Sequence, residues 1–475
     1  MMAPQFLSPV TGFSAPHFGR WVRRLSCALR RQISDPLTRG GLSLLINTGL
    51  TGLLGFGYWI IAAHLFSTYA VGVAGALVAA TTLFSGIGQL NLSGMLIRFL
   101  PRADGKSRRL VLTTYILATG TSALLASISL AFIYCFASAN SPLRLNIFQS
   151  GFLIMAVAAT AIFTIEDSVL VGLRRASWVP LENGAFGAAK IVMLFVLAPL
   201  GTAFALYSSW MIPLTLTIPV ISSVLFYRFL PPAAVPRRAA QLGQRMRARI
   251  IRFAIGDAAG GLLTQLWTYL LPVFVAALLG APVNALFFTS FLFSSTIDQV
   301  ATNYASPLTV EGSHTPEAIA TLIRRALRHI LAIILPIIGV LILISPWLLR
   351  AFGSKYVSAA PLLDMLLLAC LPKSISTVYY AYCRVQRSTH RSAVMQAYIC
   401  VATLSAVALL AHSFGLNGIG LAILAIQSSA GAFSWWALRS AFKRVTPSGE
   451  QQGRHRRANG EQAHIRAVKP PIVGR

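Results

Sequence analysis

Two lysines in the middle of long apolar stretches are the residues best placed to do chemistry in this chain. Lys190 lies midway along residues 178–200, and Lys373 lies midway along residues 361–383. A charge inside the hydrocarbon of a bilayer costs at least about 2.5–3.5 kcal/mol, so it usually faces a polar cavity or a partner. Two such cations could draw an anionic ligand into a cavity. The alternative interpretation is a structural lysine that is paired with a nearby carboxylate.

Several carboxylates lie at shallower positions, in the same half of their apolar stretches. Asp257 and Asp298 are candidates for binding a coupling H⁺ or Na⁺, because an acid near a cavity can accept a cation. For the other acids we favour ion pairs with nearby basic residues: Glu166, Asp167 and Glu182 with Arg174 and Arg175.

Uncharged polar side chains add a weaker signal inside the apolar stretches. They are Asn47, Gln89, Asn91 and Gln265, and their amides can hydrogen-bond a polar ligand. Hydrogen bonds between neighbouring helices explain these residues about as well. Arg98 ends an apolar stretch, where it either meets an entering anion or anchors the helix by extending its side chain to the surface.

No catalytic constellation is present in the sequence. The 8 histidines are dispersed, the 5 cysteines show no paired spacing, and no Gly-rich phosphate loop of the GxxxxGK[ST] type occurs. We therefore expect no metal site, no cofactor and no enzymatic activity.

The composition determines what kind of chain carries these residues. Of 475 residues 56% are hydrophobic and only 11% are charged, and the mean hydropathy is +0.69. In soluble domains about a quarter of the residues are charged. The much lower charged fraction of this chain excludes an ordinary soluble enzyme. Apolar stretches long enough to cross a bilayer predict an all-α polytopic membrane protein with about twelve spans. We expect them at about 41–63, 72–97, 110–135, 148–172, 178–200, 203–228, 251–279, 283–306, 328–349, 361–383, 392–412 and 416–438.

The distribution of charge supports this segmentation. The chain has 40 Lys and Arg against 12 Asp and Glu. Of the connections on one side, only two carry basic residues, namely Arg144, Arg350 and Lys355, whereas every connection on the other side is basic. Basic loops stay in the cytoplasm, so the spans predict that both termini are cytoplasmic. The net charge of +28 is then a topology signal, and no nucleic-acid partner is expected.

The chain divides into two groups of six spans. We expect a basic cytoplasmic segment at 1–40, a first lobe at 41–228, a cytoplasmic linker at 229–250, a second lobe at 251–440 and a disordered tail at 441–475. Basic and apolar residues at 18–33 have helical spacing, which favours an amphipathic helix on anionic membrane lipids, and a floppy basic tail explains them about equally well. An even number of spans per half predicts parallel repeats around a central cavity.

Short motifs at corresponding places in the two halves carry a family resemblance. The first half contains LFSTYAVG at 65–72, GIG at 86–88 and LIRFLP at 96–101, and the second contains LRAFGSKY at 349–356 and AAPLL at 359–363. With these motifs the chain resembles the lipid-linked oligosaccharide (O-antigen-type) flippases of the multidrug/oligosaccharidyl-lipid/polysaccharide superfamily. The resemblance covers about residues 40–440, and Arg98 matches a basic position of the family motif.

The resemblance implies a function for the candidate residues. The chain would move polyprenyl-pyrophosphate-linked oligosaccharide from the inner to the outer leaflet of a bacterial inner membrane, for polysaccharide biosynthesis or export. Lys190, Lys373 and Arg98 would then meet the pyrophosphate or acidic sugars. Asp257 and Asp298 would lie on spans that line the cleft. We expect a monomer, with other polysaccharide-assembly proteins as candidate neighbours.

Two other functions stay open. A multidrug or cation exporter of the same superfamily often carries a carboxylate in its first span, whereas residues 41–63 contain no Asp or Glu. A membrane polysaccharide polymerase usually has a large outer loop, whereas no outer connection here exceeds roughly a dozen residues.

Overall fold

The computed structural model describes residues 36–90, 92–102, 107–136, 144–230, 261–314, 319–386 and 388–445. Within these residues the protein is all-helical, which confirms the predicted fold class, and no strand occurs. The first half contains α2 (Pro36–Leu65), α3 (Thr68–Gly88), α4 (Leu92–Phe99), α5 (Ser107–Phe136), α6 (Ile147–Gly172), α7 (Val179–Leu197) and α8 (Ala203–Val224). The second contains a helix at Gly261–Leu279, α10 (Ala281–His314), α11 (Ile319–Arg350), α12 (Ala360–Val385) and α13 (Thr389–Val445).

Short helical turns join some of these helices. Four are 3₁₀ turns, at Leu100–Arg102, Ala176–Trp178, Ala198–Leu200 and Ser354–Ala359, and a π-helical turn at Leu225–Phe229 ends α8. The guanidinium of Arg108 donates hydrogen bonds to the carbonyl oxygens of Phe226 and Leu230 at this turn. Carbonyls at a helix end lack intrahelical donors, so Arg108 satisfies two of them.

Ten helices of the described chain are long and apolar enough to cross a membrane. One of them is α13, whose backbone is non-helical at Gly415 (φ 55°), so it comprises two helices that meet at a kink. The 34-residue α10 is not among the ten but is also long enough to span. With α13 counted as two helices and α10 added, the described helices correspond in number to the twelve predicted spans.

The predicted span at 72–97 differs from the structure. α3 ends at Gly88, and the short helix α4 starts at Leu92. Leu90 between them has φ 49°, a left-handed conformation that a continuous α-helix cannot contain. Residues 72–97 read as one apolar span, so hydropathy alone did not reveal this break.

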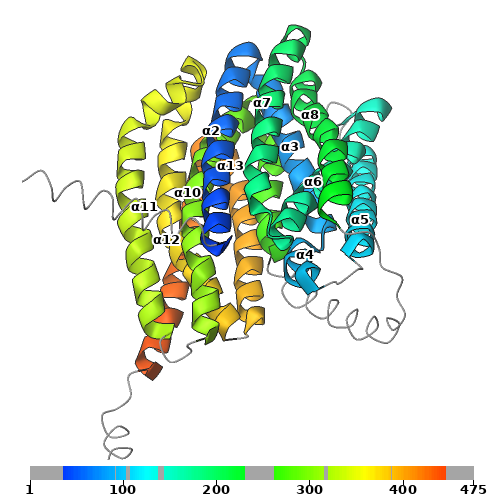
Figure 1. Cartoon of the computed structure of the whole chain (residues 1–475). Coiled ribbons are helices and arrows are strands. Elements are labelled where there is room, and N and C mark those ends of the chain that lie inside the picture. The colour runs from blue at the N-terminus through cyan, green and yellow to red at the C-terminus, as the bar shows by residue number, and fades with distance from the viewer. Residues whose placement is uncertain are drawn as a thin grey trace, which may run out of the picture.

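The helices form two groups (Figure 1). The groups meet mainly through α3 and α10. α2 packs on α7, and α7 packs on α8. α3, α5 and α6 pack on one another, and α8 packs on α3 and α6. In the second group α12 packs on α10, α11 and α13. Two lobes are also a feature of the predicted fold. The linker that we expect between them lies largely outside the described residues. The predicted boundaries of the terminal segments fall inside helices instead, because α2 already begins at Pro36 and α13 continues to Val445, five residues into the predicted disordered tail.

The two groups of helices approach closely where small residues, Gly72 of α3 and Ala281 of α10, face each other. Asn284 of α10 is fully buried, and its Nδ2 donates a hydrogen bond to the carbonyl oxygen of Gly72, at 2.7 Å. A Cβ at Gly72 would lie 1.7 Å from the carbonyl oxygen of Ala281, so only glycine fits there. Nearby, the rings of Phe56 and Phe293 stack with their centroids 4.7 Å apart.

Candidate functional site

Lys190 lies inside the first group of helices, in a cage of aromatic rings. Its Nζ is 3.6 Å from the centroid of Trp210 on α8, and 5.3 Å from the centroids of Tyr58 on α2 and Phe186 on α7. The side chain is 4% exposed. Rings within about 6 Å attract a cation through their quadrupole, and this attraction is stronger away from water. The cage therefore stabilises a cation that packing has removed from lipid.

The cage is held rigid by hydrogen bonds. The hydroxyl of Tyr58 donates to the carbonyl oxygen of Leu206 at 3.0 Å and shares a hydrogen bond with the hydroxyl of Ser209 at 2.8 Å. Among the described residues, no carboxylate lies within 4.0 Å of Lys190. The described structure therefore does not show Lys190 paired with a carboxylate. Binding of an anion by Lys190 stays a prediction.

Lys373 has a different environment. Its ammonium on α12 forms an ion pair with the carboxylate of Asp298 on α10, and it lies 4.5 Å from the ring centroid of Trp267. The two side chains are 23% and 17% exposed. Lys373 therefore fits the alternative interpretation from the sequence, that of a structural lysine paired with a nearby carboxylate. Because Lys373 already neutralises Asp298, a free coupling cation at Asp298 would have to displace it.

The three acids of the first group do not form the ion pairs that we favoured from the sequence. The described structure contains no contact within 4.0 Å between any basic group and Glu166, Asp167 or Glu182. Arg175 instead lies over the ring of Phe229, 5.2 Å from its centroid. The expectation was wrong because adjacency along the chain does not place the arginine side chains inside the helix bundle, where the carboxylates point.

These three carboxyl groups form a buried acidic cluster instead. Oε1 of Glu166 accepts hydrogen bonds from the hydroxyls of Ser222 and Tyr115, but its Oε2 is buried without a donor. Both carboxylate oxygens of Glu182 also lack a donor among the described residues. Asp167 differs, because both its oxygens accept from Nδ2 of Asn183, at 3.1 and 3.3 Å. A buried polar atom without a partner usually costs about 1–3 kcal/mol. The carboxyl groups of Glu166 and Glu182 are neighbours, so a proton on one of them can be donated to the other.

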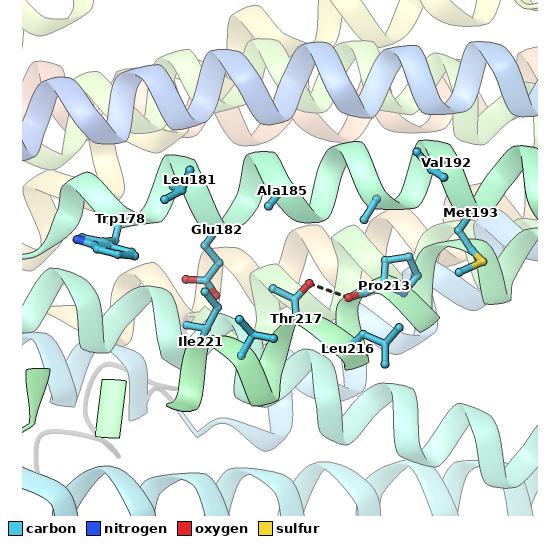
Figure 2. Close-up of a pocket in the computed structure, with 12 residues that line it drawn as sticks. Trp178, Leu181, Glu182, Ala185, Val192, Met193, Pro213, Leu216, Thr217 and Ile221 are labelled. Atoms are coloured by element: carbon cyan, nitrogen blue, oxygen red, sulfur yellow. Dashed lines mark hydrogen bonds between the residues drawn. The ribbon is translucent and has the colours of Figure 1, made fainter. Parts of the chain in front are cut away.

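A groove between α7 and α8 reaches this cluster. Figure 2 shows Glu182 projecting from α7 towards Ile221 and Thr217 of α8, with Trp178 at the same end of the groove. The groove has a volume of about 490 Å³ and is otherwise lined by apolar side chains. The sequence did not single out this cluster as a site, although the close spacing of Glu166, Asp167 and Glu182 in apolar surroundings was a visible signal.

The remaining predicted residues are scattered. Asn47 is half-buried on α2, and its Oδ1 is buried without a donor. Gln89 caps the end of α3, and its Oε1 accepts from the hydroxyl of Ser93 at 3.0 Å. Gln265 lies against α3, where a Cβ at Gly86 would be 2.9 Å from its Nε2. The contacts of Gln89 and Gln265 lie between neighbouring helices, which fits the interpretation that these side chains bond helices to one another.

Three predicted positions cannot be placed. Asp257 and Asn91 lie outside the described residues, as does the side chain of Arg98, whose backbone belongs to α4. The amphipathic helix expected at 18–33 also lies outside them. In the part of the chain that the structure describes, no group of three or more His, Cys, Asp or Glu side chains could hold a metal ion.

Comparison with known proteins identifies the fold. No family model and no curated protein matches the chain. An inward-facing multidrug resistance MATE family transporter of the MOP superfamily is similar in structure, with a TM-score of 0.67 at 15% identity over 86% of this chain and 99% of that chain. An outward-facing structure of such a transporter gives 0.62 at 15% identity, over 86% and 96%.

A third similar structure differs in its described chemistry. It is a MOP superfamily transporter from Pyrococcus furiosus, with a TM-score of 0.59 at 13% identity over 87% of this chain and 98% of that chain. Its description states that a reverse polarity of the binding pocket suggests a different function. The chain therefore has the fold of MATE family transporters.

Proposed function

We propose that this protein is a membrane transporter that moves polyprenyl-pyrophosphate-linked oligosaccharide from the inner to the outer leaflet by alternating access. The observation that carries the proposal is Lys190, a cation buried among aromatic rings with no carboxylate beside it in the described structure. The fold and the motifs of the two halves support a transporter. The charge of Lys190 supports an anionic substrate.

The main energetic barrier to this transport is removal of water from the polar headgroup. Moving a sugar pyrophosphate through hydrocarbon removes water from many polar groups, at several kcal/mol each. A protein path that supplies polar partners and one fixed cation lowers this cost, while the polyprenyl tail stays in lipid. An inside-negative potential also favours outward movement of an anion, by about 2.3 kcal/mol per charge per 100 mV. Net transport therefore does not require a free ion site at Asp298, where Lys373 already supplies the counter-charge.

The aromatic cage is physically connected to the contact between the two groups of helices. Trp59 lies 5.7 Å from Trp210, the ring closest to Lys190, and 4.8 Å from Phe288 of α10, measured between ring centroids. A substrate that moved Lys190 or Trp210 would thus disturb Trp59 and its packing on α10. These rings therefore form a contiguous packed path along which rocking of one lobe against the other would reach the site.

A cation exporter of the same superfamily is the second candidate, and the fold comparison fits it equally well. The acidic cluster of Glu166, Asp167 and Glu182 is the observation that favours it, because carboxylates suit a cationic drug. Against it, α2 contains no Asp or Glu, and Lys190 would repel a cation.

Transport by the purified protein in liposomes tests the proposal. The assay follows a defined polyprenyl-pyrophosphate sugar through its access to a glycosidase added outside, and follows a cationic dye in parallel. We expect movement of the lipid-linked sugar and none of the dye. Lys190→Gln removes the charge from the cage, whereas Lys355→Gln removes a charge from the exposed turn after α11 and serves as the matched control.

We expect Lys190→Gln to slow sugar transport at least about tenfold, because one charge-assisted contact is worth roughly 1.5–3 kcal/mol. The control should keep the wild-type rate. Dye export without sugar transport would reject the flippase in favour of the cation exporter. Equal rates in Lys190→Gln and Lys355→Gln would reject the role of Lys190.

A further inference from the structure

A second groove lies in the other group of helices, between α12 and the two parts of α13. Its volume is about 780 Å³. Its lining comes from three segments: Tyr379 to Cys383 of α12, His390 to Tyr398 at the start of α13, and Ser429 to Ala437 near the end of α13. It is far along the chain from Lys190, and the transport proposal does not use it.

One end of the groove is cationic. His390 and Arg391 line it there, and both side chains are exposed. No carboxylate lies within 4.0 Å of either group in the described part of the chain. An exposed guanidinium with no acidic neighbour retains its donors for an incoming anion, and its planar fork fits two oxygens of a phosphate.

The rest of the groove is aromatic and apolar. Phe433 lies between Tyr379 and Trp436, with ring centroids 6.2 and 5.9 Å away. The hydroxyls of Tyr398 and Ser429 share a hydrogen bond of 2.8 Å that ties the two parts of α13 together along the groove. Such walls suit a hydrocarbon chain better than a free inorganic anion.

The rim of the groove faces outward from the helix bundle. Val394 is 68% exposed and Trp436 is 67% exposed, which in a membrane-spanning chain means contact with lipid. A further exposed basic residue, Arg439, lies near the end of α13. By the distribution of charge this is the end predicted to face the cytoplasm, where anionic lipids are enriched and where basic pockets between helices bind lipid headgroups.

We propose that this groove binds one anionic phospholipid of the cytoplasmic leaflet. The phosphate lies at Arg391 and His390, at the end of the groove where Trp436 also lies, and an acyl chain runs past Val394 towards Tyr398 and Ser429. This lipid differs from the transported carrier. The site holds together α12 and both parts of α13, and α12 also carries Lys373.

Native mass spectrometry of the full chain tests the lipid site. The protein is exchanged into micelles with equal amounts of phosphatidylglycerol and phosphatidylcholine, and the lipid retained is counted. We expect phosphatidylglycerol to be retained about tenfold better than phosphatidylcholine. Arg391→Gln should abolish this preference, whereas Arg384→Gln, at the same end of the bundle but outside the groove lining, should keep it.

A second variant keeps the test decisive if Arg391→Gln folds poorly. Val394→Trp leaves the charge intact and places a large side chain at the rim, so it should reduce retention of phosphatidylglycerol. Equal preference in Arg391→Gln and Arg384→Gln would overturn the proposal. So would full displacement of phosphatidylglycerol by equimolar polyprenyl phosphate, which would make this a carrier site, or by inorganic phosphate, which would make it an anion site. None of these outcomes depends on transport of the lipid-linked sugar.

Discussion

The contact between Gly72 and Ala281 offers a direct test of how the two groups of helices move. A Cβ at Gly72 would lie 1.7 Å from the carbonyl oxygen of Ala281, whereas real Cβ contacts essentially never fall below 3.0 Å. Gly72→Ala must therefore separate α3 and α10 by about 1.3 Å or more. That movement stretches the hydrogen bond from Asn284 to the carbonyl oxygen of Gly72.

The energetic effect follows from the burial of Asn284. Its side chain is 0% exposed, so losing its acceptor costs about 1–3 kcal/mol. A free energy of that size shifts a two-state equilibrium by about 5–150-fold. The cost applies only to the arrangement in which α3 and α10 are in contact. Gly72→Ala should therefore populate an arrangement in which this end of the bundle is open.

Hydrogen–deuterium exchange with mass spectrometry measures this opening. We expect faster exchange in peptides from the first turns of α3 and α10, and unchanged exchange in α5 and α12. Gly339→Ala on α11 is the matched control, because nothing lies within 4 Å of its Cβ position. A folded Gly72→Ala protein with wild-type exchange in both peptides would refute the idea that this glycine holds the two groups together.

Two further predictions concern the buried charges. Glu182→Gln should raise the free energy of unfolding by about 1–3 kcal/mol, because its amide can donate a hydrogen bond to the neighbouring carboxylate of Glu166, whose Oε2 lacks a donor. A lower melting temperature in the variant would contradict this reasoning. Lys373→Met should destabilise the protein by up to about 3–5 kcal/mol, because it leaves Asp298 unpaired. Partial solvation of the pair reduces this loss. Adding Asp298→Asn should recover most of that loss in a thermal melt, and a double variant that is no more stable than Lys373→Met would contradict the pairing.

Much of the fold was predictable from the sequence because the bilayer imposes simple length and charge rules. A helix must be about 20 apolar residues long to cross, and basic loops stay on one side. These rules placed most helix ends within a few residues, for example 148–172 against Ile147–Gly172 for α6. They failed at Leu90, because a local left-handed backbone leaves hydropathy unchanged.

The sequence by itself also determined that Lys190 and Lys373 lie deep in apolar segments, since depth depends only on position along a span. Only the tertiary structure decided what each lysine meets. Asp298 is 75 residues from Lys373, and Tyr58 is far from Lys190 along the chain, so these contacts depend on which helix faces pack together. One lysine is neutralised by a carboxylate and the other is surrounded by rings, because a side chain's partner is set by helix rotation and packing.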